Sequence, residues 1–69
     1  MKQNKNQLTD SNEILIDLLE TVLVPAPMPS DLYKKSFIGT VVGFLESYVT
    51  VEDQDGNCFD IEPDRLTIQ

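Results

Sequence analysis

The stretch Tyr48-Val-Thr-Val-Glu-Asp-Gln-Asp-Gly-Asn-Cys-Phe-Asp-Ile-Glu62 decides the fold, because it predicts one β-hairpin with an apolar face and an acidic face. Two loop lengths fit its turn. The pair Asp55-Gly56 is typical of a two-residue type I′ loop. That loop would place Val51 opposite Asp60, so the acid would stand beside core valines and Phe59 would be exposed.

A three-residue loop, Gln54-Asp55-Gly56, gives the better register. It brings four large apolar side chains to one side of the hairpin. Burying each of them contributes ~1.5–3 kcal/mol, and a slip by one residue would forfeit most of that. We therefore predict a type I turn at Gln54-Asp55 followed by Gly56 in the left-handed region, a G1 bulge. The expected pairs are Asp53 with Asn57, Val51 with Phe59, Val49 with Ile61, Thr50 with Asp60 and Glu52 with Cys58.

The other side of this hairpin is acidic. Residues 46–69 hold seven acids and one base, so they carry −6 of the chain's net charge of −7. A solvated face that keeps a small β-protein soluble and blunts edge pairing would explain this charge without a partner. The alternative is a surface that binds a protein partner. Its candidate residues are Glu52, Asp53, Asp55, Asp60, Glu62 and Asp64, together with Tyr48.

Upstream, residues 10–24 have the pattern of an amphipathic helix. Asp10 is a good N-cap, and Glu13 follows three residues later as in a capping box. Such a helix would belong to the core or would form the interface with a second copy of the chain. The apolar positions that follow the helical period are Ile14, Leu15, Leu18, Leu19, Val22 and Leu23. A homo-oligomer would form through Leu15, Leu18, Leu19 and Val22.

The remaining segments complete a division into four parts. Residues 1–9 are polar and predict a flexible tail. Residues 25–31, with prolines at 25, 27 and 29, predict a stiff connector. Residues 32–69 change to a period of 2 and predict a small β-barrel-like domain with strands at 37–45, 48–52, 58–62 and 66–68, where Gly39 and Gly43 suggest bulges or a sharp coil. The expected fold class is α+β, an N-terminal amphipathic helix followed by a short antiparallel β-meander.

The β region also resembles a known family. The stretches that carry the resemblance are Gly39-Thr-Val-Val-Gly-Phe44, Tyr48-Val-Thr-Val-Glu-Asp53 and Phe59-Asp-Ile-Glu-Pro-Asp-Arg-Leu-Thr-Ile68, with Gly56 between them. They are similar to the strands of small SH3-like barrels, including the KOW type, in which a short turn before the last strand places a leucine in the core. The resemblance covers residues 37–69 and implies an SH3-like small barrel. The basic residues that nucleic-acid-binding members use are missing.

No catalytic or metal-binding pattern accompanies this fold. The chain has no histidine and one cysteine, Cys58, whose acidic neighbours would make it a poor nucleophile. The segment Asp53-Gln-Asp-Gly-Asn57 is similar to a calcium loop, but Gly56 is its fourth residue rather than its sixth and position 12 is Asp64 rather than glutamate. We therefore expect no metal, no cofactor and no enzymatic activity.

Composition narrows the class of partner. A net charge of −7 argues against direct binding of nucleic acid or of anionic membranes, whereas a protein partner with a basic surface suits it. The N-terminus lacks the apolar region of a signal peptide, and no apolar run reaches the ~18 residues of a membrane span. A single thiol is typical of a reducing compartment. These features predict a cytoplasmic protein.

Two functional hypotheses follow. The first is a small acidic protein-interaction module that acts through the acidic hairpin face, through self-association of the helix, or through both. The second is an acidic inhibitor of the phage type, whose carboxylates imitate backbone phosphates and block a nucleic-acid-binding enzyme of a host. A phosphate mimic should lose affinity steeply as salt rises, whereas apolar docking should not.

Overall fold

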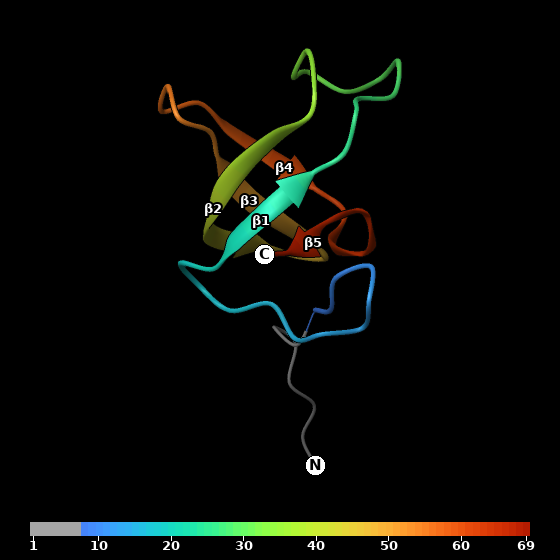
Figure 1. Ribbon diagram of the computed structural model, residues 1–69, viewed down its shortest axis with the longest axis vertical. Coiled ribbons are helices and arrows are strands. Elements are labelled where there is room, and N and C mark those ends of the chain that lie inside the picture. The colour runs from blue at the N-terminus through green and yellow to red at the C-terminus, as the bar shows by residue number, and fades with distance from the viewer. Residues whose placement is uncertain (1–7) are drawn as a thin grey trace.

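Five antiparallel strands form one sheet in the computed structural model, which describes residues 8–69. The elements are β1 (Thr21–Val24), β2 (Phe37–Leu45), β3 (Tyr48–Glu52), β4 (Cys58–Ile61), the 3-10 turn η1 (Pro63–Arg65) and β5 (Thr67–Ile68). Their order across the sheet is β4-β3-β2-β1-β5. Figure 1 shows β2 curving, so that β1 and β5 lie in front of β3 and β4. Of the predicted tail at 1–9, residues 1–7 lie outside the described residues.

The predicted hairpin register is confirmed. Val49 pairs with Ile61, Thr50 with Asp60, Val51 with Phe59 and Glu52 with Cys58. The Asp53 N–H donates to the Asn57 carbonyl at 2.8 Å, and the Gly56 N–H donates to the Asp53 carbonyl at 3.3 Å. Gly56 has a φ of +88°, in the left-handed region. The three-residue loop therefore forms, and Val49, Val51 and Ile61 are buried while Phe59 is partly buried against them.

The two glycines of β2 have different roles. The register between β2 and β3 shifts between Val41 and Gly43, which marks a bulge at this point of the strand and lets β2 bend. Gly39 instead lies where β3 comes close, because a Cβ built on it would stand 2.5 Å from Cγ1 of Val51. The expectation of a bulge is thus confirmed near Gly43, and Gly39 permits close packing of two strands.

The predicted α+β fold with an N-terminal helix over 10–24 is wrong. Between residues 8 and 69 the structure contains no α-helix. Residues 8–16 form a loop closed by a bridge between Thr9 and Leu15, and residues 21–24 form β1, which pairs with β2 on one side and β5 on the other. Val22, which was expected on a helical interface, is fully buried. No helix in this described range is long and apolar enough to cross a membrane.

Asp10 explains why the capping signal does not start a helix. Its buried carboxylate accepts hydrogen bonds from the backbone N–H groups of Asn12 and Ile14, both at 2.9 Å, and from that of Ile68 at 2.9 Å. Short acidic side chains that bond to nearby backbone compete with helix formation. Here the third bond also ties the loop to β5, a contact that no helical N-cap would make. The segment Thr21-Val-Leu-Val24 adds two β-branched valines in alternation, which favours a strand.

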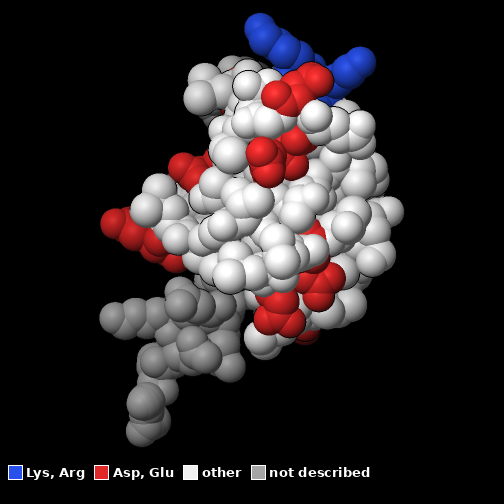
Figure 2. All heavy atoms as spheres, turned by 90° about the vertical axis from the view of Figure 1, so that its left-hand side faces the viewer, with Lys and Arg blue, Asp and Glu red and all other residues white. Residues whose placement is uncertain are grey.

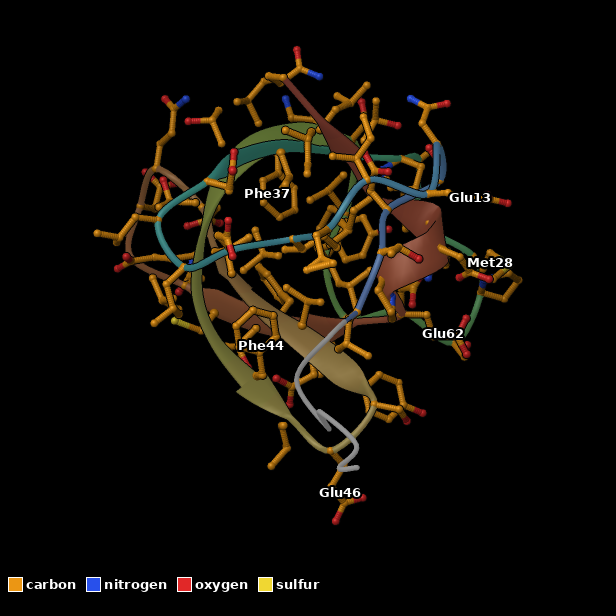
Figure 3. The ribbon with its side chains drawn as sticks, turned by 90° about the horizontal axis from the view of Figure 1, so that it is seen from below. Glu13, Met28, Phe37, Phe44, Glu46 and Glu62 are labelled. Atoms are coloured by element: carbon orange, nitrogen blue, oxygen red, sulfur yellow. The ribbon has the colours of Figure 1, made fainter. Side chains whose placement is uncertain are left out.

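The core lies inside the curve of the sheet. Figure 3 shows Phe37 and Phe44 pointing into the ring of strands, while Glu13, Glu46 and Glu62 lie at its rim. The buried apolar residues come from the strands and from three flanking segments: Ile16, Val22, Val24, Tyr33, Val41, Val49, Val51, Ile61 and Leu66. The proline-containing segment predicted as a connector belongs to the long link between β1 and β2, residues 25–36.

Candidate functional site

The seven predicted partner-binding residues do not form one patch. Asp53 and Asp55 stand at the hairpin tip, while Glu62 and Asp64 stand at η1. The other three, Tyr48, Glu52 and Asp60, lie along β3 and β4. All seven are exposed or partly exposed. Figure 2 shows acidic side chains separated by neutral surface on the face it presents, with basic side chains at one end. The charge is therefore local in the sequence but spread in space.

Asp53 builds the turn. Its Oδ1 accepts hydrogen bonds from the backbone N–H groups of Asn57 and Asp55, both at 2.9 Å. The bond from Asn57, and less strongly that from Asp55, holds the pKa of this carboxyl below its ordinary value, although partial burial opposes the shift. Asp55, by contrast, is exposed at the tip. Of these two carboxylates, Asp55 is the one that a partner can engage without opening the turn.

Asp60 is positioned by its neighbour across the strands. The hydroxyl of Thr50 donates to its Oδ1 at 2.6 Å, which fixes the carboxylate on the outer face of the hairpin. Tyr48, two residues before Thr50 along β3, is exposed on the same face. This arrangement gives β3 and β4 a partly ordered polar surface.

A groove lies between the hairpin tip and residues 32–38; we call it the tip groove. Its volume is about 620 Å³. Asp53, Asp55 and Asn57 line it from the hairpin, while Lys34 and Lys35 line it from the β1–β2 link. Its apolar lining consists of Leu32, Tyr33, Phe37, Ile38 and Phe59. One side of the groove is thus acidic, one side is basic and the lining between them is apolar.

Three aromatic rings pack together in the tip groove. The ring centroids of Tyr33 and Phe37 lie 5.5 Å apart, those of Tyr33 and Phe59 lie 5.7 Å apart, and those of Phe37 and Phe59 lie 5.9 Å apart. The first two pairs meet edge to face, an arrangement that aromatic quadrupoles favour. Tyr33 is buried, whereas Phe37 and Phe59 are partly exposed and can contact a ligand.

A second groove, of about 420 Å³, adjoins the first across Leu32, Tyr33 and Phe59, which line both. Tyr48 and Asp60 line this second groove, as does the exposed thiol of Cys58. The structure therefore brings four of the predicted residues, Asp53, Asp55, Tyr48 and Asp60, to two neighbouring grooves. Glu62 and Asp64 line another hollow with Leu8 and Ser47, and Glu62 also lines a small hollow of about 170 Å³ together with Tyr48 and Asp60.

The sequence interpretation missed the aromatic cluster and the lysines. Phe59 was assigned to the core, and Tyr33 was given no role. A usable signal was present, because the aromatic residues Tyr33 and Phe37 stand on either side of the pair Lys34-Lys35. The contact of this link with the hairpin depends on residues more than 20 positions apart, which spacing alone does not predict.

Among residues 8–69 no three histidine, cysteine or acidic side chains gather closely enough to hold a metal ion. Comparison of the chain with protein-family models, with curated proteins and with solved structures found no match.

Proposed function

We propose that this chain is a non-catalytic, acidic protein-interaction module, and that a basic and apolar segment of a partner protein lies in the tip groove. The observation that carries the proposal is the lining of this groove, where exposed Asp55 stands beside the partly exposed rings of Phe37 and Phe59. Apolar side chains of the partner gain by burial on the rings. A basic side chain gains from the carboxylate and from the aromatic faces.

The two lysines determine which way round the partner segment lies in the tip groove. Lys34 and Lys35 line the same groove as Asp55, so a basic side chain is attracted at the hairpin and repelled at the β1–β2 link. An acidic or neutral part of the partner would meet the lysines. Like charges placed against each other suppress wrong orientations and wrong partners.

We also propose that the β region is a small SH3-like barrel and that the protein is cytoplasmic. The resemblance of residues 37–69 to small SH3-like barrels is supported by the short 3-10 turn at Pro63–Arg65, which is followed by buried Leu66. A cytoplasmic location is supported by the free, exposed thiol of Cys58, since such thiols persist in reducing compartments.

The test is affinity capture from the source cell with three forms of the chain, run at low and at high salt. The wild type and Glu46→Lys should retain the same proteins, while Asp55→Lys should lose them. Glu46 is the matched control, because it is exposed in the β2–β3 turn and gives the same change in charge. Far-ultraviolet circular dichroism checks that all three forms are folded. Equal capture by the wild type and Asp55→Lys would reject the tip groove as the binding site.

The same experiment separates the module from the nucleic-acid mimic. A mimic depends on total charge, so Glu46→Lys and Asp55→Lys should weaken capture alike, and added nucleic acid should release the captured enzyme. A partner in the tip groove should stay bound when nucleic acid is added. It should also keep part of its binding at high salt, because salt does not screen apolar contacts.

A further inference from the structure

The loop before β1 carries apolar side chains that the core does not use. Within residues 11–20 only Ile16 is buried. Ile14, Leu15 and Leu18 are about half exposed, and Leu19 is 76% exposed. We call these four residues the leucine surface. Single exposed leucines need no explanation, whereas large contiguous apolar patches mark interaction sites. Four large, exposed apolar side chains within residues 14–19 are therefore candidates for such a patch.

The backbone of this segment is held in a costly conformation. Leu19 has a φ of +68°, in the left-handed region that side-chain-bearing residues avoid. It is kept there by two hydrogen bonds with β2: the Leu19 N–H donates to the Val41 carbonyl at 2.7 Å, and the Val41 N–H donates to the Glu20 carbonyl at 3.0 Å. Strain that the surrounding structure maintains is a feature of functional sites. Here the strained residue is also the most exposed of the four.

Every charged side chain within residues 8–33 is acidic. Glu13, Asp17 and Glu20 lie in the same segment as the leucine surface and are exposed or partly exposed, and no lysine or arginine occurs between residues 8 and 33. If two copies met symmetrically through this surface, their acids would oppose one another. A partner with basic residues around an apolar centre would complement it.

We propose that the leucine surface docks a basic amphipathic segment of another protein, at a site separate from the tip groove. Figure 1 supports the separation, because the loop before β1 lies below the sheet while the hairpin tip and the β1–β2 link lie at the top. The chain would then join two partners, one at each end of the sheet. Because the two surfaces share no residue, either proposed site can be rejected by experiment without rejecting the other.

The probe is a synthetic leucine–lysine peptide about 18 residues long, or five turns of helix, labelled with a fluorophore. Its control has the same composition with the leucines dispersed around the helix. Leu19→Asn is the decisive variant, because asparagine tolerates the left-handed region and so removes the apolar side chain without disturbing the backbone. Met28→Asn is the matched control, since Met28 is 51% exposed and belongs neither to the leucine surface nor to the lining of the tip groove.

We expect Leu19→Asn to weaken peptide binding roughly ten-fold or more, with a melting temperature equal to or above that of the wild type. Met28→Asn should bind the peptide as the wild type does. In ¹⁵N–¹H spectra of Asp55→Lys, whose tip groove no longer attracts a basic segment, the peptide should shift signals of residues 11–20 and leave those of the hairpin tip in place. Equal binding of the dispersed peptide, unchanged binding by Leu19→Asn, or shifts confined to the hairpin tip would each overturn the proposal. Sedimentation that shows a dimer abolished by Leu19→Asn would assign the surface to a second copy instead.

Discussion

Arg65 in η1 holds Asp31 of the β1–β2 link with two parallel hydrogen bonds, Nη1 to Oδ1 at 3.3 Å and Nη2 to Oδ2 at 2.9 Å. The same Nη2 donates to the Tyr33 hydroxyl at 3.0 Å, and that hydroxyl donates to the Pro25 carbonyl at 2.9 Å. This network joins a long link to the turn before β5. Because Tyr33 also belongs to the aromatic cluster, the network fixes one wall of the tip groove.

Replacing Arg65 by methionine should loosen that wall. Methionine keeps an apolar stem of similar reach but removes every donor, so both the Asp31 carboxylate and the Tyr33 hydroxyl lose a partner. We expect the melting temperature to fall by roughly 5–10 °C. The melting temperature of Arg65→Lys should lie between those of the wild type and Arg65→Met, since an ammonium cannot make the parallel pair of bonds. If Asp31→Asn lowers the melting temperature as much in the Arg65→Met background as in the wild type, the two residues are not coupled and this interpretation is wrong.

The hairpin could be predicted because local and nonlocal signals agree there. Gly56 favours one turn, and the burial of Val49, Val51 and Ile61 selects the same register. β1 could not be predicted in this way. Val22 lies between β2 and β5, opposite Gly39 and Ile68, so its state depends on residues 17 and 46 positions away. Within its own segment the apolar pattern fits a helix equally well, and tertiary pairing overrides such local patterns.

The candidate site shows the same contrast between local and nonlocal signals. Exposure of Asp60 follows from the alternation of β4, and exposure of Asp55 follows from its place in the loop, both of which the sequence predicts. The grooves follow from the packing of Tyr33 against Phe59, which are 26 positions apart and belong to the β1–β2 link and to β4. A prediction from spacing therefore finds the charged residues but not the apolar surface beside them.

Alanine at the two glycines of β2 should have opposite effects. A Cβ on Gly39 would stand 2.5 Å from Cγ1 of Val51 and 2.8 Å from the backbone carbonyl of Glu52, so the strands must separate. We expect Gly39→Ala to reduce the free energy of unfolding by ~1–3 kcal/mol. A Cβ on Gly43 would meet nothing closer than Thr50 at 4.0 Å, so Gly43→Ala should be neutral or stabilising by up to ~1 kcal/mol. Urea unfolding of both variants gives the comparison, and the reverse order of stabilities would contradict the packing described for β2 and β3.

Valine at Gly56 should destabilise the hairpin through the backbone alone. The position has a φ of +88°, and a Cβ there would lie 3.9 Å from the nearest atom, a carboxylate oxygen of Glu52. Space is therefore sufficient, and the cost comes from holding a β-branched residue in the left-handed region, ~1–3 kcal/mol. Gly56→Asn should destabilise the protein less than Gly56→Val does, because asparagine tolerates this region. A thermal melt decides the matter: an unchanged melting temperature for Gly56→Val would mean that the three-residue loop does not set the register.

Asp10 should make the stability of the chain depend on acid. Backbone N–H groups, that of Ile68 first and then that of Ile14, hold the pKa of its carboxyl below the ordinary value, against the opposing effect of burial. In the unfolded chain this pKa returns to about 3.9, so the unfolded state binds the proton more tightly. The stabilisation is therefore complete above about pH 5 and is lost as the pH falls through the folded pKa. Asp31 and Asp53 have pKa values shifted in the same direction, so acid should act on both ends of the sheet.

Asp10→Asn tests this dependence, because the amide oxygen can still accept from Asn12 and Ile14 while its NH₂ group faces the N–H of Ile68 and cannot accept from it. We expect a melting temperature roughly 10 °C lower at neutral pH and a smaller further decrease between neutral pH and about pH 3 than the wild type shows. Asp10→Ala loses all three bonds, so its melting temperature should be lower still. Its melting temperature should decrease with acid no more than that of Asp10→Asn. If Asp10→Asn keeps the acid dependence of the wild type in full, the carboxylate that joins the loop to β5 is not a source of that dependence.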